Sequence, residues 1–340
     1  MTAVLDFPIR RRLRANARTK NSTLPMTLPT RGYEYHESVL LAETIERLAP
    51  EPGRIFLDGT IGGGGHSAAL LKAGADVIGI DQDGDALAHT ALLLAEYGDR
   101  FQAVRGNFSE AGEILDALGV SQIDGALLDL GVSSRQLDAA ERGFSFMREG
   151  PLDMRMDPSA PVNAADLVNT MSGDQLERIF RDFGEDPAAR KVAVRLVRDR
   201  MVTPFTTTKQ LADAVETVIP RRGRTHPATR IFQALRIAVN RELDVLAAGL
   251  AAFSQQLAPG GRFAVITFHS LEDRIVKTFF KTHATEFLDR PEWPEARPNP
   301  DFIFKAVTRK PVIASEAEQR ANPRARSAKL RVVERISDAR

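Results

Sequence analysis

Four consecutive glycines, Gly62–Gly65, separate an apolar segment from a helical pattern, and few folds accommodate that arrangement. Residues 55–57, Ile-Phe-Leu, are typical of a buried parallel strand that ends shortly before the glycines. From Ser67 onward the apolar spacing is that of a helix, so the turn directs backbone N–H groups and the positive helix end toward one place. Consecutive glycines lose much conformational entropy on folding, which favours a ligand that approaches this backbone closely.

A carboxylate after the next apolar segment narrows the choice of ligand. Residues 77–80 predict a second strand, and Asp81 ends it about 20 residues after the glycines, where an acidic residue accepts hydrogen bonds from ribose hydroxyls. Gly62, Gly64 and Ser67 match the dinucleotide pattern G-x-G-x-x-G only loosely. Nicotinamide dinucleotides and S-adenosylmethionine both carry a ribose, so these residues leave both cofactors open.

Strands and helices then alternate in a way that predicts a doubly wound parallel sheet. Helical patterns at 86–97 and 114–118 alternate with apolar segments at 101–104 and 123–130. Ligands of such sheets bind at the carboxyl ends of the strands. We therefore expect the site near Gly64, Asp81, Phe108 and Asp129.

The alternation stops after the fourth strand. No strand pattern is visible from Ser134 to about residue 224, and the helical candidates there are 164–170, 173–183, 187–201 and 208–218. A long helix is expected over 227–257, then a strand over 262–268, a helix capped by His269 to Asp273, and an edge pair at 302–307 and 329–335. The pattern predicts an α/β sheet domain, 33–133 with 225–340, that is interrupted by a helical domain over 134–224.

Composition excludes several kinds of chemistry. The 340 residues include no cysteine, which rules out disulfides, iron–sulfur clusters and a thiolate that attacks a cytosine carbon. We expect no metal centre and no membrane segment, and a cytoplasmic location. The net charge is only +1, so a nucleic-acid surface must be a local patch. Residues 1–32 are Arg-rich and predict a disordered basic extension, unless Met26 is the true start.

Several long runs of residues resemble one family, the bacterial 16S rRNA cytosine-N4 methyltransferases. The resemblance extends from about Tyr35 to Ile336, and the Arg-rich segment before Tyr33 departs from it. The runs that carry it are His36–Leu41, the glycine stretch, Leu128–Ser134, Arg142–Phe146, Gly150–Asp157, His226–Arg230, Phe268–Arg274 and Asn322–Ser327.

The resemblance implies a Rossmann-like class I methyltransferase sheet with an inserted helical domain. It also implies S-adenosylmethionine as the cofactor and methyl transfer to N4 of a cytidine in the decoding region of 16S rRNA. The partner is then 16S rRNA within the small ribosomal subunit, and a homodimer is left open. The family's cofactor contacts match Gly64, Gly65, His66, Asp81, Phe108, Asp129 and Gln136.

Two residues are candidates for the chemistry itself. Asp129 can accept a hydrogen bond either from N4 or from the amino-acid end of the cofactor, and the sequence does not separate these roles. His269 ends the fifth strand on the same edge of the sheet, although a lone histidine is more often structural. Glu272 and Asp273 are expected to cap the following helix.

Lys191, Arg195 and Arg198 recur at helical spacing in the inserted domain. They predict either an RNA-binding face that follows phosphates or an ordinary solvated face. Two other functions remain open from the strand and glycine pattern alone: a nicotinamide-dependent oxidoreductase and a non-catalytic ribosome-assembly factor.

Overall fold

The computed structural model describes residues 38–337 except 222, 224 and 225. The predicted basic extension, with Met26, lies outside the described residues. The chain divides into two compact units, which we call the sheet unit (Met1–Gly131 with Val245–Arg340) and the helical unit (Val132–Asp244). Within the described residues, no helix is both long and apolar enough to cross a membrane.

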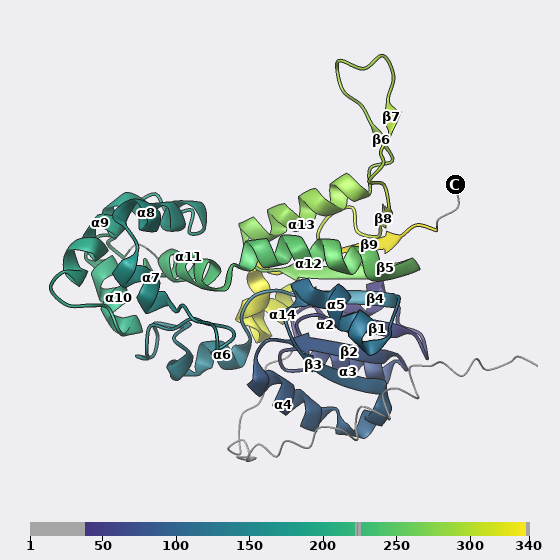
Figure 1. Ribbon diagram of the computed structural model, residues 1–340, viewed down its shortest axis with the longest axis horizontal. Helices are drawn as coiled ribbons and strands as arrows, with labels where there is room; N and C mark the ends of the chain where they lie inside the picture. Colours follow the sequence, from purple (N-terminus) through teal and green to yellow (C-terminus); the bar gives the residue numbers. More distant parts are fainter. Residues whose placement is uncertain (1–37, 222, 224–225, 338–340) are drawn as a thin grey trace, which may run out of the picture. The chain divides into compact units, whose positions relative to one another are not determined.

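The sheet unit contains a seven-stranded sheet in the order β3-β2-β1-β4-β5-β9-β8 (Figure 1). β1 to β5 run parallel, and β9 is antiparallel to both of its neighbours, β5 and β8. The predicted doubly wound sheet and its antiparallel edge pair are therefore confirmed. The strands are β1 (Ile55–Asp58), β2 (Asp76–Asp81), β3 (Phe101–Arg105), β4 (Ile123–Asp129), β5 (Leu257–Thr267), β8 (Phe304–Ala306) and β9 (Lys329–Arg335).

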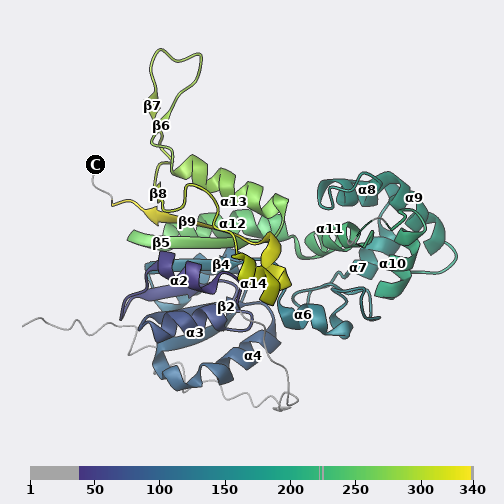
Figure 2. The ribbon, with the colours of Figure 1, turned by 180° about the vertical axis from the view of Figure 1, so that it is seen from behind.

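Neighbouring residues along each strand enter different hydrophobic cores, which is why the parallel strands are almost continuously apolar. Leu57 and Val265 join the core formed with α5, α12 and α13, whereas Phe56 and Ala264 join the core formed with α2 and α3. Figure 2 shows the molecule from behind the view of Figure 1. The helices are α2 (Leu41–Leu48), α3 (Gly65–Lys72), α4 (Gly84–Leu93), η1 (Ala95–Arg100), η2 (Phe108–Glu110), α5 (Ala111–Leu118), α12 (Glu242–Gln256), α13 (Ser270–His283), α14 (Glu316–Ala321) and η4 (Pro323–Ser327).

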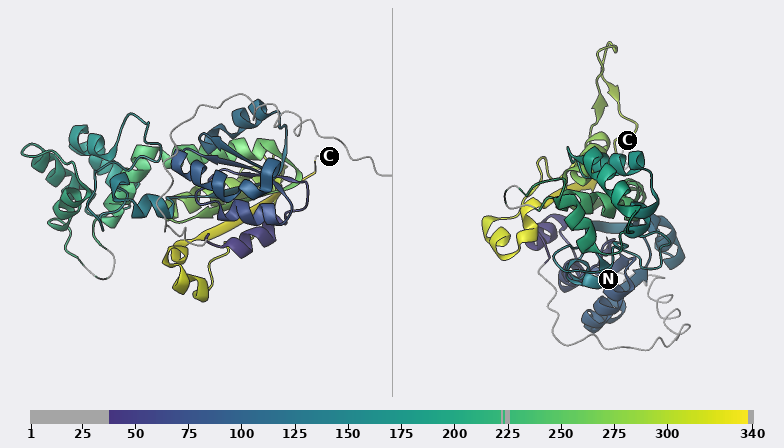
Figure 3. Two further views of the ribbon diagram at one scale, coloured as in Figure 1. Left: turned by 90° about the horizontal axis from the view of Figure 1, so that it is seen from below. Right: turned by 90° about the vertical axis from the view of Figure 1, so that its left-hand side faces the viewer.

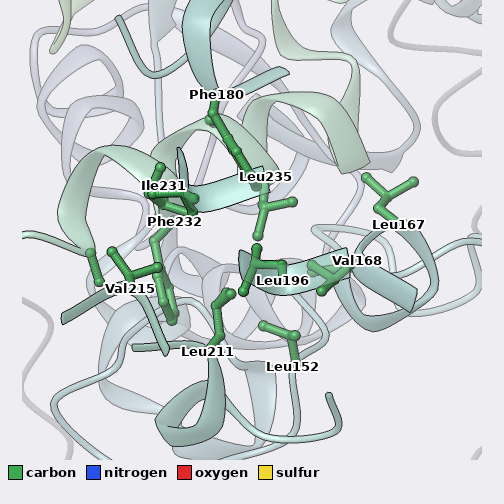
Figure 4. Close-up of a cluster of buried hydrophobic side chains, with 14 of the residues drawn as sticks. Leu152, Leu167, Val168, Phe180, Leu196, Leu211, Val215, Ile231, Phe232 and Leu235 are labelled. Atoms are coloured by element: carbon green, nitrogen blue, oxygen red, sulfur yellow. The ribbon is translucent and has the colours of Figure 1, made fainter. Parts of the chain in front are cut away.

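The helical unit has a core of its own, drawn in Figure 4, in which Phe180, Leu196, Leu211 and Leu235 are fully buried. Four predicted helices are observed within two residues of their expected ends, because capping boxes at Asn163, Ser172 and Thr207 mark three of the starts. The helices are α6 (Ser134–Asp138), η3 (Ala140–Arg142), α7 (Ala164–Thr170), α8 (Gly173–Asp182), α9 (Ala189–Arg200), α10 (Thr208–Glu216) and α11 (Thr229–Asn240).

The prediction of one long helix over 227–257 was wrong, because the structure has two helices there. α11 ends at Asn240, and Arg241 takes a left-handed conformation (φ 49°) before α12 starts at Glu242. Arg236 and Glu242 form a bidentate ion pair across the break, with N–O distances of 2.8 and 2.9 Å. The apolar stripe continues through both helices, so periodicity alone does not reveal the break.

Smaller differences occur at element ends. α3 begins at Gly65, two residues before the expected start, and the helix predicted over 86–97 ends at Leu93 before η1. β5 starts at Leu257, five residues earlier than predicted. An unpredicted ribbon, β6 (Phe287–Leu288) with β7 (Arg297–Pro298), extends away from the rest of the sheet unit (Figure 3).

Candidate active site

Three parallel strands, β1, β2 and β4, each end in an aspartate: Asp58, Asp81 and Asp129. These strands are neighbours in the order β2-β1-β4, and the carboxyl ends of parallel strands meet at one edge of a sheet. The structure thus brings together the two aspartates that the sequence predicted and adds a third.

The glycine turn after β1 is required by packing within the protein itself. Gly62 and Gly64 have positive φ angles of 47° and 81°, which other residues rarely adopt. A Cβ on Gly64 would lie 2.8 Å from the Thr90 methyl carbon, and one on Gly65 would overlap the Ser38 hydroxyl. These contacts explain the two glycines without a ligand, so their approach to a cofactor stays a prediction.

Asp81 joins the glycine turn to the end of β2 through a hydrogen bond. Its Oδ2 accepts a hydrogen bond from the Gly62 N–H (3.0 Å), and its Oδ1 accepts one from the Asp83 N–H (2.9 Å). Burial raises the pKa of Asp81 to about 6. The Gln82 backbone also donates to this carboxylate. A carboxylate has about four lone-pair sites, so about one remains for a further donor such as a ribose hydroxyl.

Asp129 lies beside His66, which comes from the first turn of α3. The His66 Nδ1 is 3.6 Å from the Asp129 Oδ2. Burial lowers the pKa of His66 to about 4, so its ring is neutral at pH 7. Burial, and then repulsion from Asp58 and Glu272, raises the pKa of Asp129 well above its ordinary value. The Asp129 Oδ1 and the His66 Nε2 are buried and have no hydrogen-bond partner among the described residues.

Asp58 is the functional candidate that the sequence interpretation missed. Its side chain is buried, its Oδ2 accepts from the Ser67 hydroxyl (2.7 Å), and its Oδ1 accepts from the Thr60 N–H (3.2 Å). Thr60 in turn accepts a hydrogen bond at Oγ1 from the Asp129 N–H (2.6 Å). Burial raises the pKa of Asp58 to about 6. A charged residue that ends a buried strand is the signal that could have found it.

His269 precedes α13 and caps it, together with Glu272. The His269 Nδ1 accepts from the Glu272 N–H (3.4 Å), and the Glu272 Oε2 accepts from the Phe268 N–H (2.8 Å). The His269 Nε2 is buried and lies 3.1 Å from the Glu272 Oε1. Asp273 was expected to cap the same helix, but its carboxylate binds Lys329 (3.0 Å) and Arg331 (2.8 Å) of β9 instead.

Phe108 packs against two glycines, which have no side chain that would occupy its position. A Cβ on Gly249 of α12 would lie 2.5 Å from its ring, and one on Gly59 would lie 3.0 Å from its Cβ. The ring is only partly buried, so part of it faces away from the protein. Its predicted contact with the adenine is compatible with this position and stays a prediction.

Gln136, from the helical unit, completes the capping box of α6. Its Oε1 accepts from the Ser133 N–H (3.0 Å), and its own N–H donates to the Ser133 hydroxyl (3.2 Å). The residue is buried. Its predicted contact with the cofactor is therefore an additional role, which stays a prediction.

The predicted RNA-binding residues all lie on α9, but an aspartate lies among them. Arg195 forms an ion pair with Asp199, and the Arg198 Nη2 lies 3.2 Å from the Asp199 Oδ1. Arg198 is 69% exposed, and Lys191 is also exposed. The net positive charge of this face is therefore smaller than the spacing of the three cations suggested.

The parallel sheet, its antiparallel β9 and the row of acidic strand ends define a Rossmann-like methyltransferase. The chain belongs to the MraW methylase family, whose family model matches residues 34–336. It is 52% identical over 308 residues to a ribosomal RNA small subunit methyltransferase H of Trichlorobacter lovleyi, covering 89% of this chain and 98% of the relative.

The chain is also similar to a second curated relative and to a solved structure. A ribosomal RNA small subunit methyltransferase H of Anaeromyxobacter dehalogenans is 52% identical over 306 residues, which cover 88% of this chain and 98% of the relative. The crystal structure of an rRNA methylase from Streptococcus thermophilus covers 87% of this chain and 95% of its own, with 11% identity and a TM-score of 0.41.

Proposed function

We propose that this protein transfers a methyl group from S-adenosylmethionine to the exocyclic N4 of a cytidine in the decoding region of 16S rRNA. The observation that carries the proposal is the 52% identity, over 98% of their length, to relatives named ribosomal RNA small subunit methyltransferase H. The substrate is 16S rRNA within the small ribosomal subunit. A cytoplasmic location and a homodimer stay predictions, and light scattering of the purified protein tests the second.

The residues at the strand ends fit S-adenosylmethionine chemically. This cofactor presents a ribose diol and a positive sulfonium, and the carboxylates of Asp58, Asp81 and Asp129 form no ion pair with any described Lys or Arg. The remaining lone-pair site of Asp81 suits a ribose hydroxyl. His66, Gly64 and Gly65 then lie toward the methionine end, with Phe108 against the adenine and Gln136 as a further contact.

The bound cofactor supplies a methyl group on sulfur, and the protein must orient N4 and accept its proton. The N4 lone pair is delocalised into the ring, so an acceptor placed for the N4 hydrogen assists attack. Asp129 is our candidate, because its Oδ1 is buried and has no partner among the described residues. His269 is the second candidate, although its Nδ1 caps α13 and its Nε2 lies 3.1 Å from the Glu272 Oε1.

We assign recognition of the RNA to the helical unit, with Lys191, Arg195 and Arg198 as contacts to phosphates. Arginine and lysine that neutralise phosphates give an affinity that falls with salt. Because Asp199 pairs with two of these cations, the net positive charge of the face is reduced and we expect a moderate affinity for RNA. Such a surface suits an enzyme that must release its RNA after one transfer.

A transfer assay with two substrates tests the proposal. The purified protein is incubated with S-adenosylmethionine that is labelled in the methyl group and with unmodified small subunits or protein-free 16S rRNA. We expect label in 16S rRNA in at least one arm. Binding to subunits with no label in either arm would favour the assembly-factor alternative, and tight binding of NAD instead would favour an oxidoreductase.

A further inference from the structure

The carboxylates at the strand ends lack a compensating cation. Among the described residues, Asp58 accepts from Ser67 and Thr60, and Asp81 accepts from backbone N–H groups. In that same part of the chain, Asp129 has the neutral His66 within ion-pair distance. No described Lys or Arg pairs with any of the three. A buried group of acids is unfavourable when ionised, and none of the described residues supplies a cation that would balance its charge.

Two described carboxylates near Asp129, those of Asp58 and Glu272, add to this imbalance. Asp58 faces it from β1, and Glu272 faces it from α13, where its carboxylate also holds the Phe268 and His269 N–H groups. From α3 it meets His66, whose burial lowers its pKa to about 4. The same surroundings raise the pKa of Asp129 well above its ordinary value. In the protein alone, Asp129 therefore favours its protonated form.

We propose that the positive charge of the bound cofactor switches Asp129, so that its carboxylate is ionised and accepts the N4 proton only while an unreacted cofactor is present. This inference rests on the proposed function and assigns the proton acceptor that the function requires. It also explains why the buried Asp129 Oδ1 has no hydrogen-bond partner among the described residues, since this atom would accept the N4 proton.

The proposed step is balanced in atoms and charge. Asp129 Oδ1 takes the proton that N4 loses as the N4–CH3 bond forms and the S–CH3 bond breaks, with its electron pair left on sulfur. Before the step the Asp129 carboxylate charge lies opposite the sulfonium charge of the cofactor, and afterwards Asp129 is a neutral acid beside a neutral thioether. The buried site therefore keeps the same net charge throughout, which avoids an uncompensated charge.

The switch predicts a difference between substrate and product cofactors. A positive ligand lowers the pKa of nearby carboxylates. When it binds at a pH below their raised pKa values, these carboxyl groups therefore release protons. The number of protons released equals the slope of log affinity against pH. S-adenosylhomocysteine lacks the sulfonium charge and should release fewer protons. Below the raised pKa of Asp129, S-adenosylmethionine affinity should rise with pH more steeply than product affinity, by up to about tenfold per pH unit.

Calorimetric titration in buffers of different ionisation enthalpy counts these protons directly. We expect more protons released by S-adenosylmethionine than by S-adenosylhomocysteine in the wild type, and a smaller difference in Asp129→Asn, in which only Asp58 and Asp81 remain to release protons. Asp116→Asn, an exposed acid on α5, is the matched control and should keep the wild-type difference. Equal release in the wild type overturns the switch, and a difference in Asp129→Asn as large as in the wild type assigns the proton to another group and overturns the role of Asp129.

A second measurement does not need the variant to fold. Infrared difference spectra of the wild type, recorded as product replaces S-adenosylmethionine, should gain the carbonyl stretch of a protonated carboxyl group. Its absence would overturn the switch. Failure of both cofactors to bind would instead overturn the proposed function on which the inference rests.

Discussion

Thr60 links the ends of two strands, since its N–H donates to Asp58 and its hydroxyl accepts from the Asp129 N–H. We therefore regard it as a positioning residue for Asp129. Thr60→Val keeps the shape but removes the acceptor, which leaves that N–H unpaired at a cost of about 1 kcal/mol. We expect kcat to fall about tenfold while the cofactor dissociation constant changes less than about twofold.

Thr60→Ser is the matched control for this prediction, because it keeps the hydroxyl and loses only a methyl group. Steady-state kinetics and calorimetry of both variants should show kcat restored in the serine variant. Equal losses in Thr60→Val and Thr60→Ser would mean that packing of the methyl group matters and that the hydrogen bond does not.

Asp58 should make stability depend on pH. Its pKa is raised from 3.8 to about 6 in the folded protein, so the stability that its protonated form contributes is complete below about pH 4 and is lost as the pH rises through about 6. About two pKa units correspond to roughly 3 kcal/mol. Asp58→Asn cannot lose this proton, so the variant should gain stability relative to the ligand-free wild type as the pH rises.

Denaturant unfolding of both proteins at about pH 4.5 and pH 7.5 checks this expectation. The change caused by Asp58→Asn should become more favourable between the two values, by up to roughly 3 kcal/mol. If the change is the same at both values, Asp58 is ionised in the fold at a normal pKa.

At the scale of elements, the sequence predicted the parallel strands and most helices because each has a local cause. Apolar runs between turns specify β1, β2 and β4, and capping boxes specify the starts of α7, α8 and α10. The break between α11 and α12 has no such cause. It depends on the Arg236–Glu242 ion pair and on Asn240, which binds the Met154 carbonyl and the Met156 N–H across the helical unit.

Arg241 allows a test of that break. Arg241 has a left-handed conformation. For a non-glycine residue this conformation is less favourable by about 1 kcal/mol than it is for glycine. Arg241→Gly should therefore raise the free energy of unfolding by up to about 1 kcal/mol. Arg241→Ala removes the same exposed ion pair with Asp244 and keeps the strain, so it is the control. A gain in the alanine variant that equals the gain in the glycine variant would argue against strain.

The site was predictable in outline, because topology alone places strand ends at one edge of the sheet. Asp81 and Asp129 followed from that rule, and Asp58 would have followed from the same rule applied to β1. The partners of these residues were not predictable. The contacts of Ser38 and Thr90 with the glycine turn, and of Asp199 with Arg195, depend on tertiary packing that no spacing records.

At the scale of the whole molecule, the net charge of +1 makes the α9 face a meaningful local concentration of cations. Reversing Lys191, Arg195 and Arg198 to Glu should raise the Michaelis constant for small subunits and flatten its salt dependence, since fewer phosphates are neutralised. Cofactor affinity should not change. Asp199→Asn frees two arginines and should shift the Michaelis constant in the opposite direction.

Methyl-transfer kinetics at several salt concentrations check both variants. An unaltered Michaelis constant and salt slope in the triple variant would show that α9 is only a solvated face and that other surfaces hold the RNA. A weaker substrate interaction in Asp199→Asn would contradict the role of the freed arginines.

Mass spectrometry of nucleosides from small subunits methylated by the wild-type protein tests the central claim most directly. A chain without cysteine has no thiolate to activate a cytosine carbon, so the methyl group must be on a heteroatom. We predict N4-methylcytidine, at one position of 16S rRNA. A methyl group on the cytosine carbon, or on another nucleoside, would contradict the account.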